Sequence, residues 1–159
     1  MHLWLLMWLQ CSEKNNHLLY IDLSSFDTSK VRNMYGIFSF CGSLTSIILT
    51  SFKTYLLTSF GYFLEGCGRL TEINIKNFDI SSANHIAGMF QACSGITELD
   101  VSNFNTAEVE NIGSLFNNCA RLTSINVSHF DLSSVKHISG MLANKKMFVI
   151  YEVNINYYY

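Results

Sequence analysis

The sequence repeats itself every 26 residues, and this period limits the folds open to the chain more than any other feature. Each unit begins on an aliphatic residue, at Ile21, Ile47, Ile73, Leu99 and Ile125. A phenylalanine follows in every unit, at Phe26, Phe52, Phe78, Phe104 and Phe130. Cysteine recurs at Cys41, Cys67, Cys93 and Cys119, and Lys145 takes its place in the last unit. A fixed period with apolar columns predicts coils that stack and bury one face on the next.

Within a unit, the hydrophobic spacing changes from that of a strand to that of a helix. Residues 21–24 alternate apolar and polar side chains, as a short strand does. A turn-rich stretch follows, and then apolar residues at helical spacing, at Val31, Met34, Ile37, Phe38 and Cys41. Glycines inside this helical segment, at Gly36, Gly88 and Gly140, indicate a close approach of neighbouring coils. We therefore predict an α/β fold: a right-handed leucine-rich-repeat-like solenoid with one parallel sheet of short strands and short helices or helical turns on the opposite side.

The two ends of the chain depart from the repeat. Residues 1–17 form an irregular partial N-terminal repeat, residues 18–147 the five-repeat solenoid, and residues 148–159 a partial sixth strand and a tail. Repeat arrays need their end coils covered, and these end segments are poor polar caps. We expect either end-to-end self-association or a chain that is a fragment of a longer array.

Composition excludes several partners. The 159 residues carry a formal net charge of -2 and only 14% charged residues, so the basic surface that nucleic acid requires is missing. No apolar run reaches the roughly 18 residues of a transmembrane span. The apolar stretch at residues 1–9 lacks the basic start of a secretory signal, so we expect no clear signal peptide in this chain.

The residues that could carry chemistry follow the repeat and form no catalytic motif. The cysteines contain no Cys-x-x-Cys pair, so we interpret them as small buried side chains, with a disulfide between adjacent coils as the alternative. Asp27, Asp79 and Asp131 share one column, which favours carboxylates that accept backbone N–H bonds in the turn or cap the helix over a calcium site. The histidines are expected to be solvated. We predict no enzyme activity, no cofactor and no metal.

The outward positions of the predicted strands are the best candidate for a binding site. Parallel stacking would place them in columns about 4.8 Å apart, which forms a regular polar lattice suited to a protein or glycan partner. The predicted ligand-binding residues are Asp22, Ser24, Ile48, Thr50, Asn74, Lys76, Asp100, Ser102, Asn126 and Ser128. Ile48, Tyr55 and Tyr62 of the irregular second unit could add an apolar contact patch.

The unit at residues 21–44, with its Ile-Asp-Leu-Ser-Ser-Phe-Asp-Thr-Ser start, resembles the bacterial surface-protein repeat of 26 residues, the BspA-like leucine-rich repeats. The resemblance runs from about Leu18 to Leu142. It implies a cell-surface or secreted protein, with lipoproteins among its members, that acts in adhesion to a host or neighbouring cell and brings no catalytic residues. The second unit departs from the pattern at residues 53–57, and the fifth lacks its cysteine. We therefore predict a cell-surface adhesion-type binding module. The alternatives are an intracellular protein-binding scaffold and a fragment of a larger repeat protein.

Overall fold

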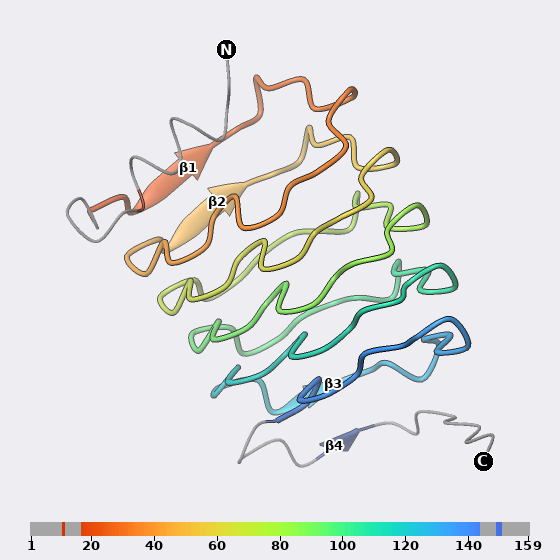
Figure 1. Cartoon of the computed structure of the whole chain (residues 1–159). Helices are drawn as coiled ribbons and strands as arrows, with labels where there is room; N and C mark the ends of the chain where they lie inside the picture. The colour runs from red at the N-terminus through yellow and green to blue at the C-terminus, as the bar shows by residue number, and fades with distance from the viewer. Residues whose placement is uncertain (1–10, 12–16, 144–148, 151–159) are drawn as a thin grey trace.

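The structure, a computed structural model, describes residues 11, 17–143 and 149–150. It contains four short strands: β1 (Tyr20–Asp22), β2 (Ser46–Ile48), β3 (Ser124–Ile125) and β4 (Val149–Ile150) (Figure 1). β1 pairs in parallel with β2, and β3 pairs in parallel with β4. The rest of residues 17–143 consists of turns and irregular segments.

The predicted α/β solenoid, with one continuous sheet and helices opposite it, is wrong. No helix occurs between residues 17 and 143, and the strands form two separate two-stranded sheets. Residues 73–76 and 99–102, the equivalents of residues 21–24 in the third and fourth repeats, belong to no strand. The chain is therefore built mostly from turns.

The predicted helical segment is not a helix because its backbone bonds alternate between two directions. In the first repeat, the Gly36 N–H donates to the Gly61 carbonyl (2.8 Å) and the Phe38 N–H donates to the Phe63 carbonyl (3.0 Å). Between them, the Ser39 N–H closes a short turn onto the Gly36 carbonyl (3.0 Å). An α-helix needs an unbroken series of bonds to the residue four back, and this alternation prevents one.

Left-handed backbone at repeated positions fixes these turns. One column has φ between 55° and 70° in every repeat, at Gly36, Tyr62, Gly88, Ser114 and Gly140. A second has φ between 56° and 72°, at Phe40, Gly66, Ala92 and Asn118. A left-handed residue ends a right-handed helix, so apolar spacing alone was misleading here. The glycines that we had interpreted as points of close approach serve first as left-handed turn residues.

The period of the sequence reappears in the bonds between repeats, which we number from residues 18–43 (first) to 122–147 (fifth). Isolated parallel bridges join one position of each repeat to the next, at Asn33, Ser59, His85, Asn111 and His137. Figure 1 shows the successive coils side by side. Residues 33–41 and their equivalents in later repeats form what we call the turn side. Residues 19–24 and their equivalents form the strand side.

The core runs between the two sides and is made of the apolar columns. Four of the five column phenylalanines are buried and Phe26 is partly buried. The rings of Phe52 and Phe78 lie parallel with centroids 6.5 Å apart, and those of Phe90 and Phe116 lie 5.9 Å apart. Each buried ring of this kind contributes roughly 1.5–3 kcal/mol.

The sequence analysis left two states open for the cysteines, a buried thiol and a disulfide between adjacent coils, and the structure contains both. Cys11 and Cys41 form a disulfide, whereas the buried thiols of Cys67, Cys93 and Cys119 donate to backbone carbonyls at 3.0–3.2 Å. Burial raises the pKa of Cys67 and of Cys119 to about 12, and raises the pKa of Cys93 well above its usual value. These three side chains are therefore protonated packing groups at neutral pH.

Most of the two predicted end segments lies outside the described residues. The described part of the C-terminal segment is β4, which pairs with β3 through Ser124 with Val149 and Ile125 with Ile150. That register corresponds to a separation of 25 residues, one fewer than the repeat period. Within the described ranges, no helix is long and apolar enough to cross a membrane.

Candidate binding surface on the strand side

The predicted ligand-binding residues all lie on the strand side. Nine of the ten are exposed, and Ile48 is half-buried. Exposure alone does not bring them together as one site, because they extend over all five repeats. Some of these residues form hydrogen bonds within their own turn, whereas others line an opening between two repeats.

The first member of the predicted column is an Asx-turn residue in four of the five repeats. Its side-chain oxygen accepts the backbone N–H two residues later at 2.8–3.2 Å, in the pairs Asp22–Ser24, Asn74–Lys76, Asp100–Ser102 and Asn126–Ser128. The Ser24 N–H lowers the pKa of the Asp22 carboxyl, and the Ser102 hydroxyl and N–H lower the pKa of Asp100. These side chains shape the turn after the strand position.

The second acidic column does the same, so this part of the sequence prediction is confirmed. Asp27, Asp79 and Asp131 each accept the backbone N–H of the serine two residues later at 2.9 Å. They act within turns, since no helix follows for them to cap. In the part of the chain that the structure describes, no group of three His, Cys, Asp or Glu side chains could hold a metal ion.

The second repeat differs in two ways. Ile48 occupies the position that holds Asp or Asn in the other repeats, and one edge of β2 forms no backbone hydrogen bonds to a neighbouring repeat within residues 17–143. The residues that flank β1 bind the backbone of Ser46 and Ile48: the Ser46 N–H donates to the Leu19 carbonyl (3.3 Å), and the Ile48 carbonyl accepts the Leu23 N–H (3.2 Å). Backbone groups of successive strand residues point to opposite edges. The N–H and carbonyl of Ile47 therefore face the third repeat.

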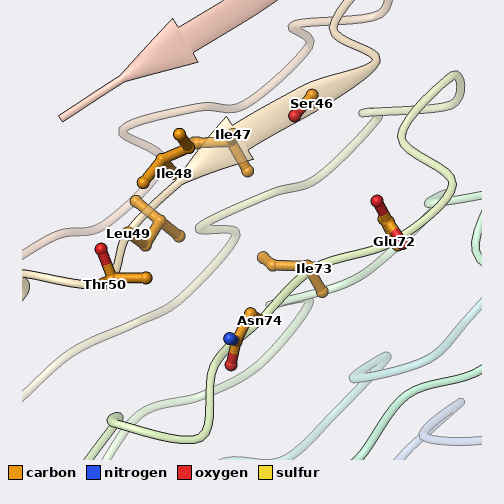
Figure 2. Close-up of a pocket in the computed structure, with 8 residues that line it drawn as sticks. All are labelled: Ser46, Ile47, Ile48, Leu49, Thr50, Glu72, Ile73 and Asn74. Atoms are coloured by element: carbon orange, nitrogen blue, oxygen red, sulfur yellow. The ribbon is translucent and has the colours of Figure 1, made fainter. Parts of the chain in front are cut away.

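No described backbone hydrogen bond joins β2 to residues 71–75 of the third repeat. A hollow of about 340 Å³ lies there instead (Figure 2). Figure 2 shows β2 on one side of it and the chain at 72–74 on the other. The lining combines four aliphatic side chains with four polar ones: Ser46, Ile47, Ile48, Leu49, Thr50, Glu72, Ile73 and Asn74.

Three of the predicted binding residues, Ile48, Thr50 and Asn74, line this hollow. The other seven do not: Asp22, Ser24, Lys76, Asp100, Ser102, Asn126 and Ser128. The structure also separates the predicted apolar patch of the second repeat. Ile48 lines the hollow, Tyr62 packs on Tyr35 with ring centroids 5.3 Å apart, and Tyr55 belongs to neither group.

Side chains, in place of backbone pairing, link the repeats next to the hollow. The Asn77 Nδ2 donates to the carbonyls of Leu49 (3.1 Å) and Phe52 (3.0 Å). Asn103 repeats the arrangement one coil later, toward Ile75 (3.0 Å) and Phe78 (2.6 Å).

The sequence analysis did not predict a role for the column that contains Asn77 and Asn103, although its residues are polar in every repeat. Polar residues recur there with the repeat period, at Ser25, Ser51, Asn77, Asn103 and His129. Ser51 and His129 also contact backbone carbonyls of the preceding repeat, at 3.0 Å each. An amide, a hydroxyl and an imidazole can each donate one such bond, so the chemistry of the column is more constant than its residue identities.

The chain matches one family model twice. The model described as "Mycoplasma protein of unknown function, DUF285" matches residues 8–99 and residues 62–156. The two overlapping matches fit a sequence in which one pattern recurs. No curated protein and no solved structure matches the chain.

Proposed function

We propose a binding function for this chain, which belongs to the DUF285 family of Mycoplasma proteins of unknown function. In this proposal the chain is a cell-surface module without catalytic activity. It holds an extended segment of a partner protein along its strand side, at the hollow between the second and third repeats.

The unused edge of β2 is the observation that carries the proposal. The Ile47 N–H and carbonyl point away from β1, and no described backbone hydrogen bond joins them to the third repeat. A donor and an acceptor on one strand edge are what an extended peptide needs for main-chain recognition. The segment gains backbone hydrogen bonds without any requirement on its sequence at those positions.

The hollow supplies selectivity for one side chain of that segment. Ile47, Leu49 and Ile73 give it apolar walls, while Thr50 and Asn74 give it a polar rim. Binding interfaces concentrate their free energy on an apolar anchor that enters a pocket ringed by polar groups. An aliphatic or aromatic side chain fits this chemistry, and its neighbours along an extended segment would point away from the hollow.

The disulfide supports the cell surface over the intracellular alternative. Cys11–Cys41 is a bond of the kind that persists outside the reducing cytoplasm. The three remaining thiols do not discriminate, because burial protects them in either compartment. The resemblance to bacterial surface-protein repeats points in the same direction.

A peptide selection tests the proposed site. Random 12-residue peptides displayed on phage are selected against the folded chain, and each recovered peptide is measured against two variants. Ile48→Lys places a charge at the hollow, whereas Ser102→Lys places the same charge on the strand side two repeats away. We expect peptides with an apolar anchor whose affinity falls at least about tenfold in Ile48→Lys and stays unchanged in Ser102→Lys. Equal affinity for both variants would contradict the site.

The compartment is tested separately on cells that produce the native protein. A membrane-impermeant biotinylation reagent is applied to intact cells and to lysed cells. Labelling of intact cells is expected for a surface protein. Labelling that requires lysis favours the intracellular scaffold and overturns this part of the proposal.

A further inference from the structure

The turn side carries a second cluster, made of aromatic rings from three successive repeats. The Tyr35 and Tyr62 rings meet with centroids 5.3 Å apart and planes inclined at 62°. The Tyr35 and His85 rings lie 5.8 Å apart at 50°. Tyr35 is 54% exposed, so part of its π surface faces solvent. Tyr35 therefore contacts both other rings, and none of the three rings is fully buried.

Two glycines make room for the cluster. A Cβ at Gly61 would lie 2.9 Å from the Tyr35 ring and 3.0 Å from the His85 ring. A Cβ at Gly88 would lie 2.5 Å from the Tyr62 ring. Each tyrosine therefore lies directly over the backbone of the next repeat. The two glycines leave room for the rings on that side, and Tyr35 stays exposed while Tyr62 and His85 are half-buried.

A carboxylate without a counter-ion accompanies the rings. Glu65 is half-buried, and its oxygens accept bonds from the Ser39 hydroxyl (2.9 Å) and the Gln91 side-chain amide (3.2 Å). Both partners are neutral, and no ion pair between Glu65 and a basic group occurs among the described residues. The two bonds orient the carboxylate and leave its negative charge uncompensated.

The other groups of the cluster add no positive charge. Burial lowers the pKa of His85, so its ring is neutral at neutral pH. Burial raises the pKa of Tyr35 first, and the charges of Tyr62 and Glu65 raise it further. Glu65 lies in the turn that follows Tyr62, where the Glu65 N–H donates to the Tyr62 carbonyl (3.2 Å). The cluster presents electron-rich ring faces beside one fixed negative charge.

We propose that Tyr35, Tyr62 and Glu65 form a binding site for an organic cation of the quaternary ammonium class. A cation is attracted to the face of a tyrosine ring, and quaternary ammonium groups are recognised by several rings together. Such a cation forms no hydrogen bonds, so the exposed rings offer it contact without competing with water for donors. Glu65 adds the Coulombic attraction that a neutral ligand of the same shape would not feel. This site is separate from the strand-side hollow.

A titration with choline and its neutral isostere, 3,3-dimethylbutan-1-ol, tests the proposal. The shifts of tyrosine ring protons report binding to the folded chain. We expect choline to bind and the neutral isostere, which has the same shape, to bind at least about fivefold more weakly. Equal affinity for the two would overturn the proposal, because the site would then recognise shape without charge.

Paired variants assign the binding to named residues. Tyr35→Leu and Glu65→Gln should each weaken choline binding about fivefold or more, whereas Tyr55→Leu and Glu110→Gln should leave it unchanged. In Glu65→Gln the amide oxygen can still accept the Gln91 side-chain amide, and the new NH2 can donate to the Ser39 hydroxyl oxygen. Tyr35 is exposed, so loss of folding is not expected in either variant. Unchanged binding in both test variants would place the cation elsewhere and contradict the site.

A vesicle experiment with the same variants distinguishes a lipid head group from a free cation as the ligand. Vesicles of phosphatidylcholine present the choline group on a membrane, and vesicles of phosphatidylglycerol serve as the control. Co-sedimentation with phosphatidylcholine that Glu65→Gln removes would assign the site to a lipid head group, whereas binding of soluble choline alone would assign it to a free cation. Either result supports the site, and the absence of both overturns it. Ile48→Lys should leave all these results unchanged, so failure here is distinct from failure at the hollow.

Discussion

The turn side and the strand side are built from the same repeat but are held together differently. On the turn side, alternate backbone N–H groups bond to the next repeat, as from Tyr62 to Ala87 (2.8 Å) and from Gly88 to Gly113 (2.9 Å). On the strand side, backbone pairing ends after β2 and resumes only at β3. Side chains such as Asn77 and Asn103 link the coils between them. A constant period therefore does not impose equal bonding on both sides of a stacked chain.

Because of this difference in hydrogen bonding, we assign stability mainly to the turn side and the proposed binding to the strand side. Backbone bonds that close within the molecule are unavailable to a partner, so the turn side contributes mainly to stability. Unpaired strand edges are open to a partner, and local stability falls where backbone bonds are exposed or missing. The aromatic cluster is the exception on the turn side, because it uses ring faces and a carboxylate and needs no backbone group.

The largest effect should come from removing a buried ring on the turn side. Phe90 is fully buried and stacks on Phe116 with centroids 5.9 Å apart, so Phe90→Ala should cost about 3–5 kcal/mol. Ile73→Ala, on the partly buried wall of the hollow, should cost less than about 2 kcal/mol. Chemical denaturation measures both. Equal losses would remove the energetic distinction between the two sides.

An intermediate effect should come from the amide that links repeats on the strand side. Asn77→Ala leaves the Phe52 carbonyl without its side-chain donor, while the Leu49 carbonyl keeps only the Phe52 N–H (3.0 Å), and the change should cost about 1–3 kcal/mol. Asn105→Ala is the control, since Asn105 is exposed and bonds only the N–H of Ala107 (3.2 Å) within its own turn. Its cost should stay below about 1 kcal/mol. A loss for Asn77→Ala no greater than for the control would show that the amide column is dispensable.

The smallest effect should be a gain in stability on the turn side. Ala92 has a left-handed backbone with φ 56°, which an L-residue other than glycine adopts at a cost of roughly 1 kcal/mol. Ala92→Gly should therefore raise the free energy of unfolding by up to about 1 kcal/mol. Ala87→Gly should lower it, because Ala87 is buried and outside the left-handed positions. If Ala92→Gly were as destabilising as Ala87→Gly, strain at this column would be excluded.

The sequence predicted positions better than conformations. The period of the phenylalanine column is the period of the bonds between repeats, because equivalent residues occupy equivalent coils. The α/β class was wrong, because Met34, Phe38 and Cys41 have a spacing that fits both a helix and a series of tight turns. Their turns depend on left-handed residues such as Phe40 and Ala92, whose identity gives no indication of that conformation.

The candidate site was predictable only in part. Outward positions on the strand side were identified, and nine of the ten are exposed. The hollow beside Ile48 was not, because it arises from missing pairing between β2 and residues 71–75, which no residue pattern reports. The aromatic cluster also escaped prediction. Tyr35, Tyr62 and His85 occupy three different columns of the repeat, so only the lateral reach of the rings brings them together.

Amide hydrogen exchange in the native state tests the difference between the two sides most directly. The N–H groups of Tyr62, Gly88 and Phe90 bond to the next repeat on the turn side and should exchange only through global unfolding. The Ile47 N–H, on the unused edge of β2, should exchange at least about a hundredfold faster. Equal protection of Ile47 and Phe90 would mean that the strand side is closed, and would contradict both the opening and the binding function proposed for it.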